Sequence, residues 1–474
     1  MTSIITIDPV TRIEGHSKIT IQLDERGEVA DAHFHVTQLR GFEKLVEGRP
    51  FQEMPGIMAR ICGICPVSHL VASAKACDEL LAVRIPPTAE KLRKVMNLAQ
   101  LVQSHALSFF YLSSPDFLLG MDAPPEERNI VGVLKAEPKL ARGGILIRKF
   151  GQNIIETLGG KRIHPAWIVP GGLSEPLEEA KRDAILATIP EAKQTAVDTL
   201  DWFVSRLDSF REEIRHFASF PSLFMALVKS DNRLAYYEGE LKIVDSNFNL
   251  LTTLDDPLDY ADVLGEAVEP FSYLKSPYYK PIGYPAGMFR VGPLARLNIA
   301  SYSGTPLADE ALRGFKALPV EERWSSFHYH YARLIEIVHG IEHIEALLTD
   351  PDILNPHVRS FAQTNSFEGV GISEAPRGTL LHHYKIDQHG LITFANLIIA
   401  TGNNNLAMNR GVYQVAKQYV KADRLEEGML NRVEAVIRAY DPCLSCSTHA
   451  IGKMPLHIQL LAPDGSVLRE VARA

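Results

Sequence analysis

The chain has 474 residues, 46% of them hydrophobic and 22% charged, so it can bury a large core without disulfide staples. Its formal net charge of −8 argues against a nucleic-acid partner or an anionic membrane surface. The sequence opens without a basic segment followed by an apolar stretch, and it holds no apolar run of roughly 18 residues. We therefore expect no signal peptide, no transmembrane segment and a cytoplasmic location.

The first residues predict a small antiparallel β unit. Apolar residues cluster or alternate in segments 4–7, 18–23 and 29–36, as they do in strands. Residues 24–27 between the last two segments have the composition of a turn. We expect three short strands within about residues 1–40.

Helical patterns dominate the rest of the chain, with further short β regions between them. Apolar positions recur at helical intervals in residues 57–81, 88–112, 148–158, 175–217 (broken near Pro190) and 324–348. Strand patterns with central turns occupy residues 236–254, 379–397 and the C-terminal segment around 463–465. We expect a mainly α fold with small antiparallel β units (α+β), in which a large helical-bundle body forms a single domain over residues 1–449.

Four of the five cysteines form two C-x-x-C pairs near opposite ends of the sequence: Cys62 with Cys65, and Cys443 with Cys446. Residues at i and i+3 share a face of a helical turn, so each pair is expected to point two thiolates at one metal. Thiolates are soft ligands that suit zinc, iron–sulfur clusters, copper(I) or nickel. The remaining Cys77 has no nearby partner and is interpreted as a buried thiol.

The distance between the pairs along the chain restricts the kind of site. Structural zinc sites usually join pairs separated by roughly 12–20 residues. Here nearly the whole chain lies between the pairs, so the complete fold must assemble the site. This favours a catalytic or redox centre over a zinc staple. Each pair alone could also be a redox motif or two buried thiols.

The segments around both pairs resemble the two signature motifs of nickel–iron hydrogenase large subunits. They read RICGICPVSH from Arg60 and DPCLSCSTH from Asp441. Further similar segments are DPVTRIEGH, RGFEKLVEGR, MDAPPEERN, RVGPLARLN, EAPRGTLLHHY and FANLIIAT. The resemblance covers essentially the whole chain and is greatest to the soluble NAD-reducing (bidirectional) type. It implies reversible heterolytic cleavage of H2 to protons and electrons.

The resemblance also implies the metal ligands. In the family four thiolates bind nickel, and the matching residues are Cys62, Cys65, Cys443 and Cys446. Of these, Cys65 and Cys446 match the thiolates that bridge to an iron with cyanide and carbon monoxide ligands, the Ni-Fe(CN)2(CO) centre. A magnesium ion is implied as well, and its protein ligands match Glu43, the backbone carbonyl of Leu397 and His449.

Other positions match residues that surround the centre in the family. Glu14 matches the proton-transfer glutamate, and Arg377 matches an arginine above the metals. His69 matches a donor to a bridging sulfur, while Pro376 and Thr401 match positions that line the cyanide pockets.

Heterolytic cleavage of H2 needs an acceptor for the hydride and a base for the proton. We expect Cys443 to be the first base, because an arginine such as Arg377 is normally locked in its protonated form. Arg377 would instead shape the electric field and exclude solvent. Glu14 would then relay the proton outward by general acid–base catalysis.

Without the resemblance these residues have ordinary interpretations. Glu14 could be a surface or capping carboxylate, Arg377 a loop residue in a salt bridge, and Glu43 part of a solvated charged face. The adjacent His382 and His383 look like a metal pair, but neighbouring residues on a strand face opposite sides.

Two positions depart from the family pattern. Many members carry an acidic residue just before the histidine that matches His105, and this chain has Ser104 there. The segment 400–403 reads ATGN, where other members often carry proline and tryptophan. Neither departure touches the expected metal ligands.

The resemblance further implies partners and processing. A maturation endopeptidase removes the family's C-terminal extension after metal insertion, so residues 450–474 are expected to be cleaved. The chain has no cysteines left for iron–sulfur clusters, which implies a small subunit that carries them, and the type implies diaphorase subunits with FMN and NAD. No Gly-x-Gly-x-x-Gly motif precedes a helix, so we expect no NAD site in this chain. Alternatives are a hydrogen sensor with the same centre, a structural zinc protein, and a non-catalytic complex-I-like subunit.

Overall fold

The computed structural model describes residues 3–449, 456–463 and 466–473. The predicted N-terminal β unit is confirmed as an antiparallel sheet of β1 (Ser3–Ile7), β2 (Ser17–Leu23) and β3 (Val29–Val36). Apolar residues alternate in these strands, and the buried ones face the core. Helix α16 (Asn405–Tyr419) packs against β3, so the sheet is joined to the C-terminal part of the chain.

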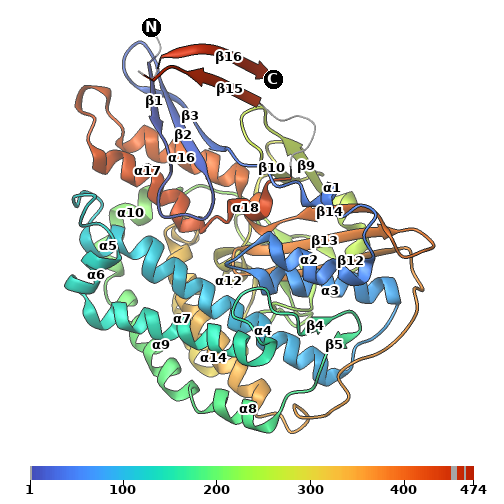
Figure 1. The fold of residues 1–474 in the computed structure, drawn as a ribbon. Coiled ribbons are helices and arrows are strands. Elements are labelled where there is room, and N and C mark those ends of the chain that lie inside the picture. The colour runs from blue at the N-terminus through green and yellow to red at the C-terminus, as the bar shows by residue number, and fades with distance from the viewer. Residues whose placement is uncertain (1–2, 450–455, 464–465, 474) are drawn as a thin grey trace.

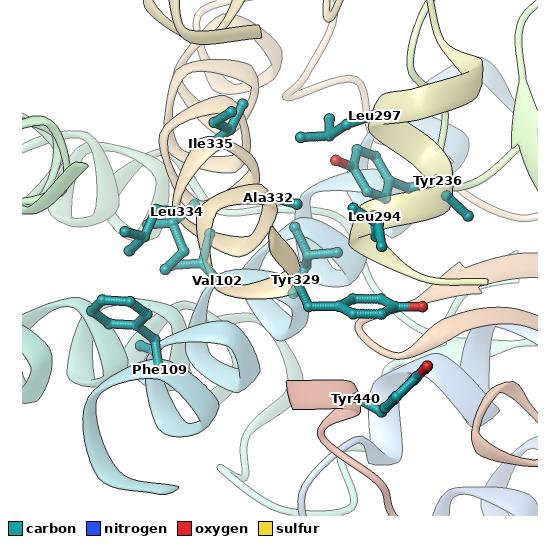
Figure 2. Close-up of a cluster of buried hydrophobic side chains, with 14 of the residues drawn as sticks. Val102, Phe109, Tyr236, Leu294, Leu297, Tyr329, Ala332, Leu334, Ile335 and Tyr440 are labelled. Atoms are coloured by element: carbon teal, nitrogen blue, oxygen red, sulfur yellow. The ribbon is translucent and has the colours of Figure 1, made fainter. Parts of the chain in front are cut away.

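Long helices form the body of the molecule (Figure 1). Helix α4 (Pro87–Ala106) packs against both α7 (Pro138–Gly159) and α14 (His328–Leu348), and α9 (Ile189–Val204) packs against α7 and α14. Helix α14 is buried on nearly all sides, as expected of a central helix. Figure 2 shows its apolar residues beside Val102 and Phe109 on one side and Leu294 on the other.

Two sheets lie beside this helical body. One has the order β11-β6-β7-β8, with β6 (Leu223–Val228), β7 (Glu240–Val244), β8 (Leu250–Leu254) and β11 (Phe289–Arg290). The other is antiparallel and contains β12 (Glu368–Ala375), β13 (Gly378–Ile386) and β14 (Ile392–Ile398). Helix α3 (Pro66–Leu81) packs directly on β12. Together these elements confirm the predicted α+β class.

The predicted helix over residues 57–81 is wrong. Helix α2 (Met54–Met58) and a 3-10 turn end at Ile61, and Cys62 then has extended backbone with φ −135° and ψ 143°. The next helix, α3, begins at Pro66, whose fixed φ suits the first turn of a helix. A loop therefore carries the first cysteine pair.

Other boundaries differ less. Helix α7 begins at Pro138 rather than near residue 148, and the helical stretch after residue 175 is divided into α8 (Glu179–Leu186), α9 and α10 (Arg211–His216). The break falls just before Pro190, which lies in the first turn of α9. Near the C-terminus, β15 (Leu456–Leu461) and β16 (Val467–Arg473) form the predicted antiparallel pair, although residues 464 and 465 of its turn lie outside the described residues.

The remaining elements are short or peripheral. They are α1 (Phe42–Leu45), α5 (Ser114–Leu119), α6 (Ile130–Ala136), α11 (Tyr260–Val263), α12 (Pro293–Ile299), α13 (Pro306–Lys316), α15 (Ala400–Asn403), α17 (Glu427–Tyr440), α18 (Leu444–Ser447), β4 (Ile168–Val169), β5 (Gly172–Leu173), β9 (Leu264–Val268) and β10 (Lys275–Tyr279). Within the described ranges, no helix is both long and apolar enough to cross a membrane.

Candidate metal centre

Four cysteine sulfur atoms from opposite ends of the chain meet inside the protein. The Sγ atom of Cys62 lies 3.3 Å from that of Cys443, and the Sγ atoms of Cys65 and Cys446 are 3.6 Å apart. All four sulfurs lie within 4.8 Å of one another, and all four residues are buried. Thiolates about 2.3 Å from one ion are at most about 4.6 Å apart, so the donor set fits a thiolate-bound metal centre.

The local backbone of the two pairs corrects the prediction that each lies on a helix face. In the N-terminal pair, Cys62 is extended and Cys65 precedes the first turn of α3. In the C-terminal pair, Cys443 is extended and Cys446 lies in the one-turn helix α18. Because the first cysteine of each pair is extended, both pairs form a turn that folds its two sulfurs toward the other pair.

The two pairs differ in the groups that contact their sulfurs. The backbone N–H groups of Ile64 and Cys65 both donate to Cys62 Sγ at 3.2 Å. Hydrogen bonds from the neighbouring thiols, with a further one from His69, lower the pKa of Cys65 well below its ordinary value. Burial instead raises the pKa of Cys443. Negative charge is therefore favoured on the N-terminal pair, and a proton is retained more readily on the C-terminal pair.

Glu14 lies against the C-terminal pair. Its Oε2 atom accepts hydrogen bonds from Cys443 Sγ and from the backbone N–H of Ser445, both at 3.1 Å, and the Ser445 hydroxyl donates to Oε1. The Leu444 N–H donates to the Glu14 carbonyl at 3.2 Å. The adjacent Gly15 has φ +91°, and a Cβ there would lie 2.7 Å from Leu444 Cβ. This close approach fixes the carboxylate beside the sulfur, and sequence reasoning had not singled out Ser445.

Arg377 is held by the residue that opens the second cysteine motif. Its Nε donates to the Asp441 carbonyl at 2.5 Å, and its Nη2 donates to Asp441 Oδ1 at 3.1 Å. Nη1 lies 3.4 Å from the hydroxyl of Ser104. Burial opposes the guanidinium charge, but Asp441 and the Cys443 thiolate outweigh it and raise the pKa of Arg377 well above its ordinary value. The guanidinium therefore keeps its protons, and Asp441 is a contact that sequence reasoning missed.

His69 begins a buried chain of polar side chains. Its Nδ1 lies 3.2 Å from His382 Nε2, His382 Nδ1 lies 2.6 Å from the Tyr384 hydroxyl, and that hydroxyl donates to Ser73 at 2.9 Å. The neighbouring His383 points the other way, as expected for a strand, and its imidazole contacts Tyr260 and Glu368. His382 is thus a partner of His69 rather than half of a metal pair.

Pro376 and Thr401 lie close to the cysteine motifs. The Thr401 hydroxyl accepts a hydrogen bond from the Cys443 backbone N–H at 3.0 Å. The Pro376 carbonyl accepts from Arg296 Nη2 at 3.2 Å. Cys77 is fully buried on α3 and donates to the Phe51 carbonyl at 3.3 Å, so its interpretation as a buried thiol is confirmed.

The residues expected to bind magnesium lie near one another. Glu43 Oε1 accepts from the Leu397 N–H at 2.9 Å and from Lys275 Nζ at 3.1 Å. Burial lowers the pKa of His449 to about 3, so its imidazole is neutral, as a metal ligand requires. Its buried Nδ1 has no hydrogen-bond partner within the part of the chain that the structure describes. A carboxylate and an unpartnered imidazole nitrogen fit a cation, although Lys275 shares the carboxylate.

Comparisons with known proteins agree with this geometry. Residues 40–141 and 225–449 match the family model described as nickel-dependent hydrogenase, and residues 4–39 match a HoxL-like model. The β subunit of the NAD-reducing hydrogenase HoxS from Cupriavidus necator is 44% identical, over 99% of each chain. The F420-non-reducing hydrogenase vhu of Methanococcus voltae contains a polypeptide that is 43% identical, over 88% of this chain and 99% of its own.

Solved structures show the same fold. The crystal structure of an NAD+-reducing [NiFe]-hydrogenase in the H2-reduced state superposes with a TM-score of 0.92 at 44% identity, over 94% of this chain and 100% of that one. The Ni-Fe-Se hydrogenase of D. vulgaris Hildenborough superposes with a TM-score of 0.77 at 23% identity, over 95% of this chain and 100% of that one.

Proposed function

Because this chain belongs to the nickel-dependent hydrogenase family, we propose that it is the catalytic subunit of a nickel–iron hydrogenase that cleaves H2 reversibly. The observation that carries the proposal is the set of four buried cysteine sulfurs within 4.8 Å of one another. They come from two C-x-x-C motifs 381 residues apart, so only the complete fold can assemble them.

The four thiolates would hold nickel, with Cys65 and Cys446 shared with an iron that carries cyanide and carbon monoxide. When bound, this centre supplies the acceptor for the two electrons of H2. The neighbouring Pro376 and Thr401 would line the pockets of the cyanide ligands. The hydrogen bond from the Cys443 N–H to the Thr401 hydroxyl supports this placement, because it fixes Thr401 beside a metal ligand.

The proton leaves by way of Cys443 and Glu14. Their contact of 3.1 Å is within the range for direct proton transfer, and burial favours the protonated form of Cys443. Ser445 donates two hydrogen bonds to the Glu14 carboxylate, which keeps it in position to receive the proton. Arg377 holds a fixed positive charge through Asp441, excludes water and stabilises negative charge at the thiolates.

A magnesium ion would bind Glu43, the Leu397 carbonyl and His449 near the C-terminal pair. The unpartnered Nδ1 of buried His449 supports this assignment. The domain would end at His449, and residues 450–474 would be removed by a maturation endopeptidase. The solved relative supports this boundary, since its entire length matches only 94% of the present chain.

Electrons would pass to a separate small subunit with iron–sulfur clusters. Four of the five cysteines meet at the centre, and the fifth, Cys77, is buried in the core. The name of the Cupriavidus necator relative supports NAD as the final acceptor, reached through diaphorase subunits that carry FMN. A cytoplasmic location follows from this link to NAD.

An activity assay of the purified complex tests the proposal. Under H2, the complex should reduce a viologen dye and NAD+, and a Cys446→Ser variant should reduce neither. Mass spectrometry of the same active sample should find the chain ending at His449. Absence of H2-dependent dye reduction in a nickel-loaded, processed complex would contradict the proposed activity.

A further inference from the structure

A second polar pocket opens beside the helical body, away from the four cysteines. It has a volume of about 200 Å³ and lies between α4, α14 and the segment that joins β6 to β7. A water molecule occupies about 30 Å³ of liquid, so the pocket holds a small ligand and not a nucleotide. No residue of this pocket takes part in the proposed reaction.

The charged side chains of the pocket are mostly cationic. Lys94, Lys229 and Arg233 line it together with a single carboxylate, Glu238. Lys94 donates to Glu238 Oε1 at 2.6 Å, and Lys229 donates to the same oxygen. Arg233 forms no salt bridge with another described residue, and its stem lies over Gly304, where a Cβ would come within 2.5 Å of Arg233 Cδ. Three cations against one carboxylate leave the pocket with excess positive charge.

Two histidines one helical turn apart on α14 form another wall of the pocket. His339 is 1% exposed, its Nδ1 lies 3.0 Å from the Thr305 hydroxyl, and its Nε2 has no hydrogen-bond partner among the described residues. The Nδ1 of His343 is also without a partner there. Burial lowers the pKa of His339 to about 3, so its ring is neutral. When the Thr305 hydroxyl donates to Nδ1, the neutral ring carries its proton on Nε2.

A buried polar atom without a partner normally bonds a ligand or water, because leaving it unsatisfied costs about 1–3 kcal/mol. A His339 N–H donor surrounded by three cations is suited to an acceptor-only group with negative charge. A cation would be repelled by Lys94, Lys229 and Arg233. A metal is also disfavoured, since the four cysteines are the only cluster of three or more potential ligands in the described residues.

We propose that this pocket binds a small oxyanion of the phosphate class, with Arg233 and Lys229 supplying charge and His339 supplying a directed hydrogen bond. Binding there requires only that the chain folds as described, and it does not depend on the hydrogenase activity.

Titration calorimetry of the protein purified with its partner chains, with inorganic phosphate at an ionic strength held constant by chloride, tests the site. We expect saturable phosphate binding that is about tenfold weaker in Arg233→Gln, because one close cation is lost. Glu238→Gln should strengthen binding several-fold, because it removes the opposing charge and keeps a hydrogen-bond acceptor for the lysines. Lys139→Gln is the matched control, since Lys139 is 90% exposed on α7 outside the pocket and pairs only with Asp198.

Opposite shifts for Arg233→Gln and Glu238→Gln, with Lys139→Gln unchanged, would support the oxyanion site. Absence of saturable binding to the folded wild-type protein would overturn it. Equal phosphate affinity in the wild type and both pocket variants would overturn it as well.

Discussion

The N-terminal cysteine pair and the C-terminal pair have the same C-x-x-C spacing but opposite surroundings. Backbone N–H groups donate to Cys62 Sγ, and His69 supports Cys65, so the N-terminal pair is stabilised as thiolate. The C-terminal pair instead meets a carboxylate, because Cys443 Sγ lies 3.1 Å from Glu14. The same motif can therefore hold charge at one end of the chain and exchange a proton at the other.

Loss of a C-terminal thiolate should have the largest effect. Cys443→Ser replaces a soft ligand with a hydroxyl, so we expect the complex to lose nickel and at least about 1,000-fold of its H2 oxidation rate. Nickel content and dye reduction measured on the same sample check this. Cys77→Ser is the control, because its buried thiol bonds only the Phe51 carbonyl, and it should retain nickel. Full nickel and full activity in Cys443→Ser would contradict the assigned ligand set.

Glu14→Gln separates proton transfer from metal binding. The amide keeps the hydrogen bonds of Ser445 but cannot accept a proton, so we expect turnover to fall by about 100- to 10,000-fold while nickel content is unchanged. Glu14→Asp should recover part of the rate. A Glu14→Gln enzyme with wild-type turnover would show that the proton leaves by another route.

Arg377→Lys should reduce turnover by about 10- to 100-fold. Lysine keeps the positive charge, but it cannot form the forked contact with the carbonyl and carboxylate of Asp441. The pKa of Arg377 is raised, so the arginine acts through its fixed charge, and the pH profile of Arg377→Lys should match that of the wild type. A new ionisation in that profile would indicate that Arg377 exchanges protons.

The smallest effect is expected from a methyl group beside Glu14. Gly15→Ala places a Cβ 2.7 Å from Leu444 Cβ at φ +91°, and should lower the free energy of unfolding by about 1–3 kcal/mol. Gly63→Ala is the matched control in the N-terminal motif, because no atom lies within 4 Å of its added Cβ. Thermal unfolding of both variants measures the difference. Equal destabilisation would argue against a tight contact between residue 15 and the C-terminal motif.

The sequence predicted the strands whose two faces differ, but not those buried on both. Residues 29–36 alternate in burial along β3, so their period was visible. Strand β6 is buried at every position and shows no alternation. In β12, Gly371 faces α3, where a Cβ would lie 2.0 Å from the Ala72 carbonyl, so close packing selects a residue of low strand propensity.

The candidate site divides in the same way. The cysteines, Glu14 and Arg377 lie in motifs that resemble a known family, so their proximity could be predicted. Asp441, Ser445, Lys275 and His382 could not be assigned, because their contacts depend on how distant segments pack. The predicted helix through Cys62 failed because apolar spacing continues across a loop that must turn two sulfurs inward.

An infrared spectrum of the purified complex in the carbonyl and cyanide stretching region, with nickel and iron measured on the same sample, tests the central claim most directly. We predict a carbonyl band together with cyanide bands, and nickel and iron in amounts close to that of the chain. Zinc without those bands, in a folded and processed chain, would contradict a nickel–iron centre and leave the four cysteines as a structural site.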